Sequence, residues 1–108
     1  MTSYSSPNSQ PRLMGFISVT ASRDLTTADC MQTLLVTLGE VVTLTLPASI
    51  ETGFWCYCVD MQAGITFAAG AGATVLSLAN NLDSAGAGGV ILCFKRSTTA
   101  WVISGDLA

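Results

Sequence analysis

The stretch TLLVTLGEVVTLTLP, residues 33–47, carries the clearest structural signal in the chain. Between residues 42 and 46, valine or leucine at the even positions alternates with threonine at the odd positions. This period of two is typical of a half-buried β-strand. Pro47 ends the strand, because proline cannot donate a hydrogen bond to a β-ladder. Only Gly39 and Glu40 separate this strand from the preceding apolar run, so the stretch predicts a tight hairpin.

Similar strand patterns recur along the chain, separated by turn residues. They predict about eight short strands, which are typical of an all-β domain, either a small antiparallel β-sandwich or a barrel. One helical turn is expected over Thr26–Cys30. The strand segments are 15–20, 33–38, 41–46, 53–61, 64–69, 73–78, 90–96 and 100–108.

The run ITFAAGAGATV, residues 65–75, contains no charged side chain. A phosphate-binding loop would lead into a helix and carry a lysine, whereas this run leads into β-branched residues. Gly70 and Gly72 provide the backbone freedom that a bend requires. The run therefore predicts a second hairpin and no nucleotide site.

The segment GFWCYCVDM, residues 53–61, is apolar on both faces of the expected strand. Both faces are therefore expected to be covered. One face meets the core, and the other meets either the second sheet of a sandwich or another subunit. If it meets a subunit, the oligomer interface comprises Trp55, Tyr57, Val59 and Met61.

Half of the residues are apolar, 10% are charged and the net charge is −3. Four basic residues without a stripe disfavour nucleic acid. The longest uncharged stretch, residues 61–82, is too diluted by small and polar residues for a transmembrane helix. The first residues do not form a secretory signal. Because an average soluble protein is about one quarter charged, this composition favours an assembly that buries surface between subunits.

The four cysteines do not predict a metal site. Cys56 and Cys58 share one strand face, and the chain has no histidine to complete a zinc site. We expect reduced thiols that act as small buried hydrophobic groups, with a Cys30–Cys93 disulfide as the alternative.

We expect no enzymatic activity and no cofactor. The absence of histidine removes the most common general base and nucleophile pairs. The seven carboxylates mostly lie in expected turns or at strand ends. Asp60 is the exception because it lies on an apolar strand, where we interpret it as a strand-end residue that faces solvent.

Residues 1–14 are polar, contain prolines and lack apolar periodicity, so we expect an extended N-terminal arm before a domain at 15–108. The arm is either a frayed tail or a segment that orders on a partner. In the second case its contacts with a capsid would involve Pro7, Pro11, Leu13 and Met14.

The segments VTLTLPASIETGFW, GITFAAGAGATV and AWVISGDLA together resemble a structural β-module of tailed bacteriophages. This module occurs in tail-fibre and spike tips and in small virion surface proteins. The resemblance covers about residues 23–107 and implies an all-β, virion-associated and usually trimeric protein without catalytic residues.

Because the chain starts with methionine and comprises an arm and one module, we expect a capsid decoration, or cement, protein. It would be made in the host bacterial cytoplasm, form a homotrimer and bind the major capsid protein on the virion surface. The alternative is the head domain of a tail fibre or tailspike that binds a host receptor.

Overall fold

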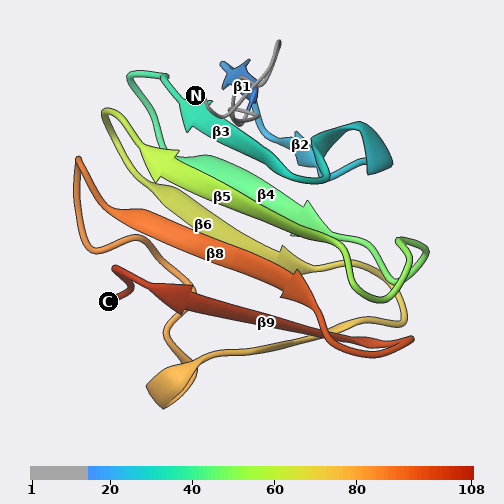
Figure 1. Ribbon diagram of the computed structural model, residues 1–108. Helices are drawn as coiled ribbons and strands as arrows, with labels where there is room; N and C mark the ends of the chain where they lie inside the picture. Colours follow the sequence, from blue (N-terminus) through green and yellow to red (C-terminus); the bar gives the residue numbers. More distant parts are fainter. Residues whose placement is uncertain (1–14) are drawn as a thin grey trace, which may run out of the picture.

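The computed structural model describes residues 15–108, which form nine short strands and two single turns of 3₁₀-helix (Figure 1). The expected arm at residues 1–14, with Pro7, Pro11, Leu13 and Met14, lies outside the described residues. In chain order, the elements are β1 (Gly15–Val19), β2 (Arg23–Asp24), η1 (Thr27–Asp29), β3 (Gln32–Val36), β4 (Val42–Leu46), β5 (Trp55–Asp60), β6 (Ile65–Ala69), β7 (Thr74–Leu76), η2 (Leu78–Asn80), β8 (Val90–Lys95) and β9 (Ala100–Gly105).

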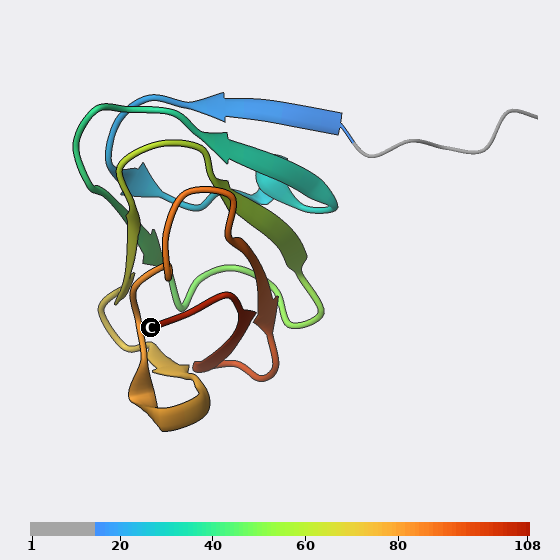
Figure 2. The same ribbon diagram turned by 90° about the vertical axis from the view of Figure 1, so that its left-hand side faces the viewer.

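The chain winds as a β-solenoid, in which the strands from β1 to β7 alternate between two sheets, whereas β8 and β9 both join the larger sheet. The larger sheet has the order β1-β3-β5-β8-β9-β7 and the smaller sheet has the order β2-β4-β6. Strands β1, β3 and β5 are parallel, as are β2, β4 and β6, because each coil stacks on the one before it. Figure 2 shows the chain passing around the space between the two sheets.

The all-β fold class is confirmed, whereas the expected antiparallel sandwich or barrel is not found. Both hairpins expected at glycine-containing turns are wrong. Gly39 and Glu40 form a corner that carries the chain from β3 in the larger sheet to β4 in the smaller one. Gly70 and Gly72 likewise lie between β6 in the smaller sheet and β7 in the larger one. The turn between β8 and β9, in contrast, joins an antiparallel pair.

Inward-facing side chains of both sheets form one apolar core. In β4, Val42, Leu44 and Leu46 are buried, as the alternation predicts, and β4 ends directly before Pro47. The expected helical turn corresponds to η1. The Asp29 carboxylate accepts a hydrogen bond from the Thr26 amide and so stabilises this turn. Within residues 15–108, no helix is long and apolar enough to cross a membrane.

Candidate functional site

The outward side of the larger sheet is mostly apolar, although Ser18, Thr33 and Ser104 also lie on it. Cys56, Cys58 and Asp60 are buried, so the residues between them on β5 point outward. The strand register places further apolar side chains beside them on the neighbouring strands. We call this surface the apolar outer face; it comprises Phe16, Leu35, Trp55, Tyr57, Val59, Val90, Leu92, Phe94 and Val102.

Three aromatic side chains of the apolar outer face are neighbours, and we call Trp55, Tyr57 and Phe94 the aromatic cluster. Trp55 lies opposite Phe94 in the antiparallel pair of β5 and β8. The Trp55 and Tyr57 rings meet edge to face, with centroids 5.9 Å apart and planes at 78°. At the edge of the sheet, Phe16 is 70% exposed. Large aromatic surface left in contact with water is typical of binding surfaces.

Charge is absent from this face. The strands of the larger sheet contain two charged residues, Asp60 and Lys95, and both are buried inside the solenoid. The smaller sheet differs, because its outward positions include Thr43, Thr45 and Thr66. The outward face of the larger sheet is uncharged and mostly apolar, whereas that of the smaller sheet is mostly polar and includes Asp24 beside Thr45. This difference indicates that the two sheets have different surroundings.

Three of the four residues predicted for an oligomer interface lie together on this face. Trp55, Tyr57 and Val59 are half-buried on the outward side of β5, whereas Met61 lies beyond the end of the strand and is exposed. Leu92 and Phe94 were missed because β8 is distant in sequence. The sequence signal that could have identified them is the alternation of inward and outward side chains in VILCFK, residues 90–95, which is the same pattern as in β5.

Asp60 does not face solvent, so that interpretation is wrong. It is 1% exposed, and its Oδ1 accepts hydrogen bonds of 3.1 Å from the amides of Gln62 and Gly64. Its Oδ2 accepts a 2.8 Å hydrogen bond from the Ser84 hydroxyl, whose oxygen accepts one from the Ile65 amide. The carboxylate therefore organises the corner between β5 and β6, and these contacts give it a structural role.

A second buried carboxylate, Asp29, pairs with Arg23. The guanidinium donates hydrogen bonds of 2.8 and 3.0 Å to the two carboxylate oxygens. Burial raises the pKa of Asp29, but hydrogen bonds from Arg23 and the Thr26 amide, with the Arg23 charge, outweigh it and hold the pKa below its usual value. This pair ties β2 to η1.

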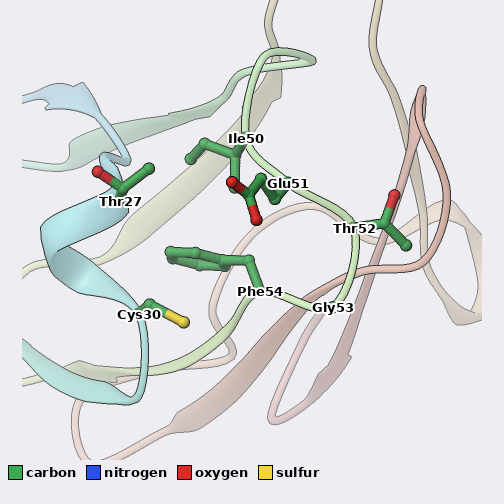
Figure 3. Close-up of a pocket in the computed structure, with 7 residues that line it drawn as sticks. All are labelled: Thr27, Cys30, Ile50, Glu51, Thr52, Gly53 and Phe54. Carbon is green, nitrogen blue, oxygen red and sulfur yellow. The ribbon is translucent and has the colours of Figure 1, made fainter.

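The η1 turn and the loop between β4 and β5 border a pocket of about 370 Å³ (Figure 3). Thr27 and Cys30 line one side of the pocket, and the 50–54 loop lines the other. The Phe54 ring points toward Cys30, and the Glu51 carboxylate lies above the ring. The pocket offers one thiol and one exposed carboxylate, without a base beside the thiol, which does not match a nucleophilic site.

Three thiols meet inside the solenoid. Cys56 of β5 lies opposite Cys93 of β8, and the sulfur of Cys58 lies 3.9 Å from that of Cys93. Hydrogen bonds from Cys56 and Cys93 lower the pKa of Cys58. Hydrogen bonds with Cys56 and Cys58, together with burial, raise the pKa of Cys93. All four cysteines are free, and Cys30 is not part of this cluster, so the Cys30–Cys93 disulfide is not present.

No protein-family model matches the chain, and neither curated proteins nor solved structures include one with significant similarity to it.

Proposed function

We propose that this chain is a structural protein that assembles with copies of itself through the apolar outer face. The observation that carries the proposal is the placement of Asp60 and Lys95, the two charged residues of the larger sheet, inside the solenoid. A face without charge can pack against an identical face with no desolvation of ions and no like-charge repulsion. Its aromatic cluster supplies side chains that commonly anchor interfaces.

We further propose that the assembled form, a homotrimer, decorates the capsid of a tailed bacteriophage. The sequence resemblance supports this role, as does a chain in which 10% of residues are charged. Each copy would add buried apolar area worth roughly 25 cal/mol per Å² before the cost of association, and capsid symmetry would repeat that contribution over the shell. Residues 1–14 would extend the contact with the major capsid protein.

The interface is tested with a charge placed in the centre of the apolar outer face. Leu92→Lys is expected to convert the oligomer to monomers at micromolar concentration, as measured by light scattering coupled to size-exclusion chromatography. Thr45→Lys is the matched control, because Thr45 is a half-buried outward residue on the smaller sheet. A monomeric wild-type chain, or an L92K variant that stays assembled, would contradict self-assembly through this face.

The capsid role is tested by mixing the protein with empty shells of the source phage and counting the bound copies per shell after sedimentation. Saturable binding of many copies, scaling with shell symmetry, is the expected result. A truncation that lacks residues 1–12 should remain an oligomer but no longer coat the shell.

The aromatic cluster also favours a second function, receptor binding by a tail-fibre or tailspike head domain. Half-exposed Trp55 beside exposed Phe94 offers ring surface of the kind that stacks on sugars. Binding to host cells without binding to shells would favour this function.

A further inference from the structure

Cys56, Cys58 and Cys93 form a buried cluster in which all three sulfur atoms lie within 4.8 Å of one another. Each of these residues is 0% exposed. Two come from alternate positions of β5, and the third comes from the adjacent antiparallel strand β8. The cluster is thus held by neighbouring strands of one sheet, which gives its sulfur atoms a defined arrangement.

The spacing of the sulfur atoms fits a metal ion at the centre of a triangle. A metal–thiolate bond of about 2.3 Å places the sulfur atoms of a planar three-coordinate site about 4.0 Å apart. The sulfur atoms of Cys58 and Cys93 are 3.9 Å apart, and the other two sulfur–sulfur separations are at most 4.8 Å, so any shortening that the site requires is less than an ångström. Side-chain rotation without movement of the strands can supply such a change.

The ligand set distinguishes between metals. Three thiolates are soft ligands that favour Cu(I) or zinc over calcium or magnesium. Structural zinc is almost always four-coordinate. Within residues 15–108, no histidine, carboxylate or fourth cysteine joins the three sulfur atoms. The nearby charged groups Arg23 and Asp29 are already engaged with each other. The site therefore matches an ion that accepts three sulfur ligands.

We infer that Cys56, Cys58 and Cys93 form a three-coordinate site for a soft metal ion, Cu(I), inside the solenoid. Ligation joins the ion to the three sulfur atoms and releases the protons of those thiols that are protonated; no electron is transferred. Because the site is closed to solvent, the ion enters as the chain folds or when β8 separates locally from β5. The bound metal would link β5 to β8, and would thereby stabilise the attachment of the C-terminal β8–β9 hairpin to the parallel coils.

The test uses the full chain, refolded from urea without oxygen in the presence of Cu(I) supplied as its bicinchoninate complex. The expected result is one copper per chain, withdrawn from the chelator, with an X-ray absorption spectrum that shows three sulfur neighbours at about 2.3 Å. Two sulfur neighbours, or no transfer of copper from the chelator, would overturn the proposal. This measurement on the wild-type chain does not depend on how any variant folds.

Two matched variants then locate the site. Cys93→Ala is expected to weaken copper binding at least 100-fold, whereas Cys30→Ala, which removes the cysteine outside the cluster, is expected to leave it unchanged. Circular dichroism of both variants checks that they fold. Loss of binding in C30A, or retention in folded C93A, would contradict the assignment. In a parallel titration, zinc bound more tightly than copper with four ligands would overturn the choice of a three-coordinate ion.

Discussion

The ammonium group of Lys95 lies 2.6 Å from the carbonyl oxygen of Ile50, and it also donates hydrogen bonds to the carbonyl oxygens of Ala48 and Thr98. Lys95 is 1% exposed, and no carboxylate pairs with it among the described residues. Three backbone carbonyl oxygens accept hydrogen bonds from the ammonium group instead. Two of them belong to the loop after β4, and the third belongs to the turn between β8 and β9. The lysine therefore joins the loop after β4 to the β8–β9 turn.

Replacing this lysine should destabilise the fold. Lys95→Met keeps most of the apolar stem but leaves the buried carbonyl oxygen of Ile50, and the partly buried ones of Ala48 and Thr98, without this donor. The free energy of unfolding is therefore expected to fall by about 3 kcal/mol. Urea denaturation measures the change. Arg96→Met is the control, since Arg96 is the exposed neighbour and should change stability by less than about 0.5 kcal/mol. Equal unfolding midpoints for the two variants would rule out this role of Lys95.

Asp60 is expected to act as a corner residue and not as a solvent-facing group. Asp60→Ala removes the acceptor for Gln62, Gly64 and Ser84, and should lower the free energy of unfolding by about 2–3 kcal/mol. Glu40→Ala, at an exposed corner, is the control and should have little effect. Thermal unfolding followed by circular dichroism distinguishes them; a D60A variant as stable as E40A would contradict the assignment.

Stability should depend on pH through Asp29. The pKa of Asp29 in the folded state lies below its usual value of 3.8. The contribution of Asp29 to stability is therefore fully present at pH values above 3.8, and it is lost as the pH falls through the lower folded-state pKa. The wild type should therefore exceed Asp29→Asn in unfolding free energy at pH 5, and the difference should shrink below pH 4. Urea titrations at a series of pH values give the comparison. A difference that stays constant from pH 5 to pH 2 would mean that this ion pair contributes no pH dependence.

Gly105 at the end of β9 should not tolerate a side chain. Its φ is +124°, and an added Cβ would collide with the carbonyl oxygen of Val90 on the paired strand. Gly105→Ala is expected to cost more than about 2 kcal/mol of unfolding free energy, combining backbone strain with the collision. Gly53→Ala separates the two effects, because Gly53 has φ +97° and open space around it. If both variants lose the same stability in urea denaturation, the collision contributes nothing.

Much of the local structure could be predicted because alternation is a local property of the chain. The even-numbered apolar residues of β4 are buried, and the opposite faces of β5 separate Cys56 and Cys58 from Trp55 and Tyr57 as the pattern indicates. Pro47 ends β4 because proline has no amide hydrogen to donate to a β-ladder, whichever strand lies beside it. The predicted interface on β5 stays a prediction, although the structure places most of its residues on one face.

Strand pairing was decided only by the tertiary structure. Gly39–Glu40 is compatible with a hairpin and with a solenoid corner, because alternation determines which side chains face inward and not which strand supplies the hydrogen bonds. In the solenoid, β4 pairs with β2 and β6, strands from the neighbouring coils. For the same reason, the sequence pattern did not predict the thiol cluster. The sequence by itself determined that Cys56 and Cys58 share a face, but Cys93 joins them only through the β5–β8 register, a contact between segments 35 residues apart that no local pattern encodes.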